Sequence, residues 1–76
     1  MNANTIIENV KKELEIIYKH ATTSTMESAR TWYAQAFEVI AFASSLLWSE
    51  NYYKESQEIE ELWENEWEAK FQKLQY

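Results

Sequence analysis

The sequence predicts an all-α fold, a small antiparallel three-helix bundle in a single domain spanning residues 1–76. The chain contains neither glycine nor proline, so it lacks both the residue that most readily takes a positive φ and the residue that interrupts helices. Apolar residues recur every three or four positions, which is the period of an amphipathic helix. Two capping boxes predict where helices begin. We therefore expect helices at about residues 5–21, 25–49 and 52–75.

The first predicted helix, at about residues 5–21, has a capping box and one apolar stripe. In Thr5-Ile6-Ile7-Glu8 the threonine hydroxyl can accept a bond from a free backbone N–H while the glutamate reaches back to the threonine N–H. We therefore expect the helix to begin at Thr5. The apolar stripe of this helix consists of Ile6, Val10, Leu14, Ile17 and Ala21, with Ile7 and Tyr18 at its edge. Ile16 falls on almost the opposite side of the helix.

The second predicted helix, at about residues 25–49, follows a run of threonine and serine. Short hydroxyl side chains compete for backbone hydrogen bonds and favour turns, and Ser24-Thr25-Met26-Glu27 repeats the capping-box spacing. Apolar residues cover nearly the whole circumference of this helix, which is typical of a central helix or of one shared with another subunit. Its predicted self-association residues are Trp32, Val39, Phe42 and Leu46.

The boundary between the second and third helices has two interpretations. Asn51 is a residue that can end a helix, and a turn there gives three helices. Because no glycine or proline enforces that turn, the alternative is a helical hairpin in which one long second helix continues without a break to about residue 75.

The third predicted helix, at about residues 52–75, has one apolar stripe. Trp63, Trp67 and Phe71 are either core residues or an exposed anchor for the groove of a partner. Because so short a chain needs a large buried apolar area, we favour the core, and we extend this interpretation to Trp32 and Trp48. The complete stripe is Tyr52, Ile59, Trp63, Trp67, Phe71 and Leu74.

Acidic residues are concentrated between residues 50 and 68, where eight glutamates accompany one lysine in a chain of net charge −6. Glu60, Glu64 and Glu68 follow one another at i, i+4, where like charges oppose helix formation. The simpler interpretation is a solvated face that maintains solubility, and the alternative is a surface for a basic partner. The candidate partner-binding residues are Glu58, Glu60, Glu61, Glu64 and Glu68.

No residue pattern indicates a catalytic, cofactor or metal site, so none is expected. His20 has Ile17 rather than glutamate three residues before it, so the Glu-x-x-His pair of di-metal bundles is missing. A glycine-rich phosphate loop cannot form without glycine. The isoelectric point near 4.7 disfavours direct binding to nucleic acid, because affinity for phosphates comes largely from lysine and arginine.

The chain is expected to be a cytoplasmic homodimer. No segment approaches the roughly 20 apolar residues of a membrane span, and no basic region followed by an apolar run opens the chain. A domain of this length removes only about 60% of its unfolded surface from water. With no cysteine and one histidine, association is a more plausible support than a disulfide or a metal.

These observations favour a non-enzymatic protein–protein interaction module. A second hypothesis is a small inhibitor of the phage or mobile-element type, whose acidic face at residues 50–68 blocks a basic, nucleic-acid-binding site on a host protein. A third hypothesis is a bundle that holds an apolar ligand between aromatic side chains, which predicts a sizeable internal cavity.

Overall fold

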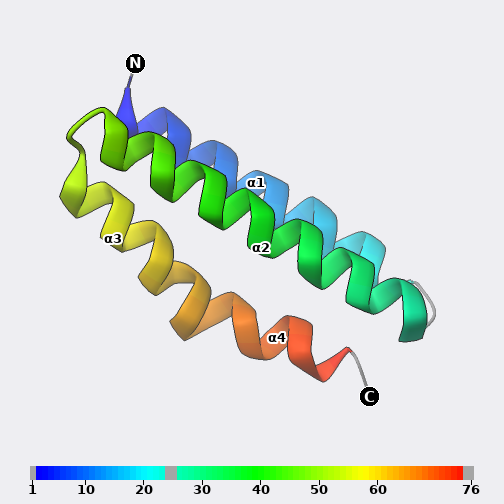
Figure 1. Cartoon of the computed structure of the whole chain (residues 1–76). Coiled ribbons are helices and arrows are strands. Elements are labelled where there is room, and N and C mark those ends of the chain that lie inside the picture. The colour runs from blue at the N-terminus through cyan, green and yellow to red at the C-terminus, as the bar shows by residue number, and fades with distance from the viewer. Residues whose placement is uncertain (1, 24–25, 75–76) are drawn as a thin grey trace.

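A computed structural model shows an all-α three-helix bundle and describes residues 2–23 and 26–74, with the side chains of 26–29 excepted (Figure 1). Helix α1 (Ala3–Thr22) and helix α2 (Met26–Ser49) form an antiparallel pair. The third predicted helix is a continuous rod built of α3 (Tyr53–Leu62), the π-helical segment η1 (Trp63–Trp67) and α4 (Glu68–Lys73). The described part of the chain thus confirms the predicted fold class.

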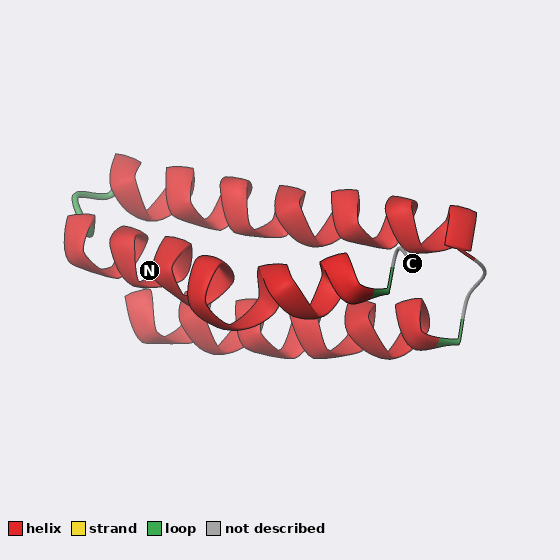
Figure 2. Ribbon diagram, turned by 90° about the horizontal axis from the view of Figure 1, so that it is seen from below, coloured by secondary structure: helices red, strands yellow, loops and turns green. Residues whose placement is uncertain are grey.

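Helix α2 is the central element of an elongated molecule. It packs against both α1 and α3, whereas α1 and α3 contact each other little. The three rods lie side by side (Figure 2) and give overall dimensions of 39 × 17 × 15 Å. The prediction that α2 is central to the bundle is therefore confirmed.

Helix α1 begins earlier than predicted, with Asn2 as its cap. The Asn2 side chain accepts a hydrogen bond from the N–H of Asn4 at 2.9 Å, and its carbonyl accepts from Thr5 and Ile6. Asparagine is among the best cap residues, so the prediction that Thr5 caps this helix is wrong and Thr5 lies inside the first turn. The second predicted capping box, at Ser24-Thr25-Met26-Glu27, lies outside the residues whose side chains are described.

Helix α2 ends in a Schellman motif, which confirms the predicted turn and contradicts the alternative of one long second helix. The N–H of Tyr52 donates to the carbonyl of Leu47 at 2.8 Å, and the N–H of Asn51 donates to that of Trp48 at 3.0 Å. This pattern needs a residue in the left-handed region, and Asn51 has φ 67°. In a chain without glycine, asparagine is the residue best suited to this conformation.

The core consists of one stripe from each rod, largely as predicted. Small residues on α2, Ala36 and Ala43, let the neighbouring helices approach closely. Tyr18 of α1 packs edge-on against Trp67 and Phe71 with ring centroids 5.8 and 5.4 Å apart, so these aromatic rings contact one another directly. The buried apolar residues are Ala3, Val10, Leu14, Ile17, Ala21, Ala36, Ile40, Ala43, Leu47, Ile59, Trp63, Trp67 and Phe71.

The π-helical segment η1 follows from the spacing of the buried aromatic residues. Ile59, Trp63, Trp67 and Phe71 repeat at a strict interval of four, and all four are buried. Four residues of an α-helix exceed one turn by about 40°, so three such steps would carry the stripe about 120° around the rod. Inserting a wider turn of i→i+5 bonds reduces this drift and keeps Phe71 directed at the core.

Trp48 is 61% exposed, so the prediction that it belongs to the core is wrong. It follows the fully buried Leu47 directly, and one residue is a rotation of about 100° around the helix. That rotation places the indole on the flank of α2. The predicted core residue Trp32 is half-buried.

Candidate interaction surfaces

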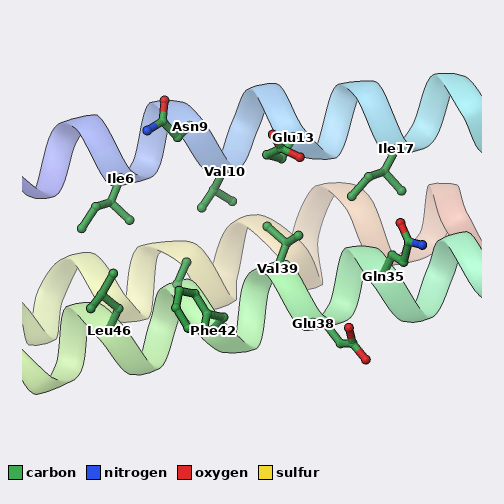
Figure 3. Close-up of a pocket in the computed structure, with 11 residues that line it drawn as sticks. Ile6, Asn9, Val10, Glu13, Ile17, Gln35, Glu38, Val39, Phe42 and Leu46 are labelled. Carbon is green, nitrogen blue, oxygen red and sulfur yellow. The ribbon is translucent and has the colours of Figure 1, made fainter.

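An open groove of about 650 Å³ runs between α1 and α2 (Figure 3), and we call it the α1/α2 groove. None of its lining residues comes from α3 or α4, whose ribbon passes behind it in Figure 3. The lining residues are Ile6, Asn9, Val10, Glu13 and Ile17 from α1, and Gln35, Glu38, Val39, Phe42, Ala43 and Leu46 from α2.

Helical periodicity produces the groove. The lining positions 6, 10, 13 and 17 on α1 follow the i, i+4, i+7, i+11 pattern of one helix face, and positions 35, 39, 42 and 46 repeat it on α2. Eleven residues span about 16 Å of helix. The floor is therefore a pair of antiparallel faces about three turns long, the shape that receives another helix.

Phe42 is the most exposed apolar residue of this groove, at 73%. Val39 and Leu46 lie beside it and are half-buried. Three of the four predicted self-association residues therefore lie together. The fourth, Trp32, is not among the lining residues, and its ring stacks on that of His20 with centroids 5.4 Å apart and an interplanar angle of 18°.

The edges of the α1/α2 groove carry acidic charge. Glu13 on α1 and Glu38 on α2 are exposed lining residues, accompanied by the neutral amides Asn9 and Gln35. Apolar side chains form the remainder of the lining. Any partner that enters the groove therefore meets an apolar floor between two carboxylates.

The predicted acidic face lies along the third rod. Glu58, Glu60, Glu61 and Glu64 are exposed and Glu68 is half-buried. Among the described residues, the ion pair with an N–O distance within 4.0 Å is Lys11–Glu8, so none of these five carboxylates forms such a pair with a described base. These acids are spread around the rod, because Glu58 lines a recess with Lys11 of α1 whereas Glu60 lies beside Ser44 of α2.

Glu60 differs from the other acids because it belongs to a hydrogen-bonded cluster between α2 and α3. The Ser44 hydroxyl donates to Glu60 Oε1 at 3.0 Å, the Ser56 hydroxyl donates to the Ser44 carbonyl at 2.9 Å, and the two hydroxyl oxygens are 2.8 Å apart. Both serines are buried. This cluster was not predicted from the sequence, although the helical period places Ser44 one turn after Ile40 and Ser56 one turn before Ile59.

Two adjoining hollows beside this cluster form a second recess, which we call the Trp48 notch. The hollows have volumes of about 340 and 290 Å³. Trp48 packs against Tyr53 at a centroid distance of 4.4 Å. The notch is lined by Ser44, Ser45, Trp48, Tyr53, Lys54, Ser56, Gln57 and Glu60.

Two further kinds of feature, a metal centre and a membrane-spanning helix, are not found among the described residues. No three histidine, aspartate or glutamate side chains there are grouped so that they could hold a metal ion. None of the described helices combines the length and the apolar character needed to cross a membrane. The side chains that line the two recesses offer apolar contact, aromatic stacking and attraction of positive charge.

Comparisons with protein families, curated proteins and solved structures found no match to this chain.

Proposed function

We propose that this chain is a non-enzymatic protein–protein interaction module that associates with a second copy of itself through the α1/α2 groove. The observation that carries the proposal is the exposure of Phe42, whose side chain is 73% exposed at the edge of an apolar groove. Full burial of such a side chain contributes about 1.5–3 kcal/mol. An exposed phenylalanine beside an apolar floor is typical of an interface rather than of a solvated face.

The second copy is favoured because one patch contains both a projection and a recess. In a two-fold dimer the same patch on both subunits meets itself, so each Phe42 can enter the groove of the partner over Val10 and Val39. The α1/α2 pairs of two copies would then pack as a four-helix arrangement. Such an interface would support a domain whose own core is small.

Charge gives this proposal a distinctive signature. Each copy has net charge −6, and Glu13 and Glu38 border the groove on both subunits. Salt screens repulsion between like charges and strengthens apolar association. The dimer should therefore become tighter as the ionic strength rises.

Analytical ultracentrifugation of the full chain tests the proposal. We expect a dimer at micromolar concentration, and Phe42→Gln should weaken it by about 100-fold or more, because an isologous interface loses two phenyl rings of about 1.5 kcal/mol or more each. Trp48→Gln is the matched control, since it removes a similarly exposed aromatic residue from the other flank of α2. A stable monomer at micromolar concentration, or equal dissociation constants for the two variants, would refute the proposal.

A second candidate function is inhibition of a basic, nucleic-acid-binding site on a host protein by the acidic face. It is supported by the exposed carboxylates of Glu58, Glu60, Glu61 and Glu64, none of which forms an ion pair within 4.0 Å with a described base. Complexes between opposite charges weaken as salt is added, which is the reverse of the dependence expected for the dimer. Charge reversal of Glu60, Glu64 and Glu68 to lysine should abolish binding of such a host protein.

A further inference from the structure

The Trp48 notch contains an exposed aromatic pair that neither the core nor self-association explains. Trp48 is 61% exposed and Tyr53 is 49% exposed. Val39 of the α1/α2 groove and Trp48 are nine residues apart, and at about 100° per residue this separation places them on opposite sides of α2. Among the described residues, the two recesses also share no lining residue. The notch is therefore a separate surface.

The turn between α2 and α3 fixes the geometry of the aromatic pair. Asn51 holds the left-handed conformation that ends α2, and its Oδ1 accepts a hydrogen bond from the Tyr53 hydroxyl at 2.7 Å. The Tyr53 ring then packs on Trp48 at an interplanar angle of 65°. An aromatic platform held in this way loses little side-chain entropy when a ligand binds.

Glu60 supplies a positioned negative charge to the same recess. The Ser56 hydroxyl donates to the Ser44 carbonyl, and the Ser44 hydroxyl beside it donates a hydrogen bond to Glu60 Oε1. A carboxylate has about four acceptor positions, so this bond fixes Glu60 and leaves capacity for a ligand.

The chemistry of the notch selects a planar cation. Aromatic faces attract positive charge, and a guanidinium both stacks on an aromatic ring and donates to a carboxylate, which an ammonium cannot do equally well. Phosphates and a second copy of this chain are disfavoured, because residues 50–68 carry eight acids and one base. We propose that the Trp48 notch binds an arginine side chain from a basic segment of a partner protein, stacked on Trp48 and hydrogen-bonded to Glu60.

Lys54 also lines the notch and opposes an incoming cation. This base gives the proposal an additional prediction, since removing its charge should tighten binding. The proposal does not depend on self-association, and it provides a specific point of contact for the second candidate function.

The test is a titration of the full chain with a short blocked peptide of alternating arginine and serine, at low salt. Trp48→Gln and Glu60→Gln should each weaken binding about twofold to fivefold, the range for exposed cation–π and ion pairs. Lys54→Gln should tighten binding, and Ile16→Gln, at an exposed apolar residue that lines neither recess, should leave it unchanged. In the unaltered protein, the indole N–H resonance that Trp48→Gln removes should shift during the titration.

Several outcomes would overturn this proposal. A peptide with citrulline, the neutral analogue of arginine, must bind more weakly, and a lysine peptide of equal affinity would exclude guanidinium recognition. Equal binding by Trp48→Gln and the unaltered protein would reduce the effect to general attraction by acidic residues. Binding of an oligonucleotide at the notch would also contradict the proposal. Because the dimer is measured separately by ultracentrifugation, failure of one proposal is distinguishable from failure of the other.

Discussion

Asn51 should contribute to stability mainly through its backbone conformation, and two substitutions separate this effect from that of its side chain. The residue has φ 67°, a region that costs a residue with a Cβ about 1–2 kcal/mol and glycine nothing. Asparagine tolerates this region better than alanine because its polar side chain can bond locally. Asn51→Ala should therefore lower the free energy of unfolding by about 1 kcal/mol.

The free energy of unfolding of Asn51→Gly should stay within about 0.5 kcal/mol of that of the unaltered protein. Glycine relieves the steric cost. It also gives the unfolded chain more conformational freedom, which lowers the free energy of unfolding by about 0.4–1 kcal/mol. It also removes the acceptor for the Tyr53 hydroxyl, an exposed bond of about 0.5 kcal/mol. The alanine variant should then melt about 4–8 °C below the glycine variant, the shift expected per kcal/mol for a domain of 60–100 residues.

Thermal denaturation followed by circular dichroism measures this difference. Protein concentration is kept constant, because association makes the melting temperature concentration-dependent. Tyr53→Phe should lower the free energy of unfolding by about 0.5 kcal/mol in the unaltered protein. It should have no effect in the Asn51→Gly variant, which lacks the acceptor for the Tyr53 hydroxyl. Equal melting temperatures for the alanine and glycine variants would refute the conformational argument.

Two further predictions use neighbouring residues as matched controls in the same assay. Leu14→Ala should destabilise the fold by about 2–5 kcal/mol because Leu14 is fully buried, whereas Ile16→Ala, at a side chain that is 52% exposed, should change stability by about 0.5 kcal/mol or less. Ser44→Ala should cost about 1–2 kcal/mol through loss of its bond to Glu60, and Ser45→Ala at the exposed neighbour should be nearly neutral. Equal losses within either pair would contradict the assigned burial or bonding.

Periodicity predicted the rods and most of the core, because each α-helix buries one stripe. The start of α1 was not predictable in the same way, since Asn2 and Thr5 are both capping residues and local sequence does not decide between them. The exposure of Trp48 depends on where the neighbouring rod lies. That position is a tertiary property, which the spacing of residues within α2 does not contain.

The π-helical segment left a signal in the sequence, namely the strict interval of four from Ile59 to Phe71. The interval indicates that a regular helix cannot keep the stripe on one face, but it does not show which turn widens. The α1/α2 groove was partly predictable, because Val39, Phe42 and Leu46 share one flank of α2. Its other half, from Ile6 to Ile17, depends on the pairing of the two helices.

The central position of α2 also has a consequence for how the chain folds. Most contacts join rods that are adjacent along the chain, α1 with α2 and α2 with α3, so each neighbouring pair can form as a helical hairpin with a short connection. Proteins rich in such local contacts fold in microseconds to milliseconds. The edge-on packing of Tyr18 against Phe71 joins residues far apart along the chain. The entropic cost of closing the loop between them is lowest once both hairpins have formed on α2.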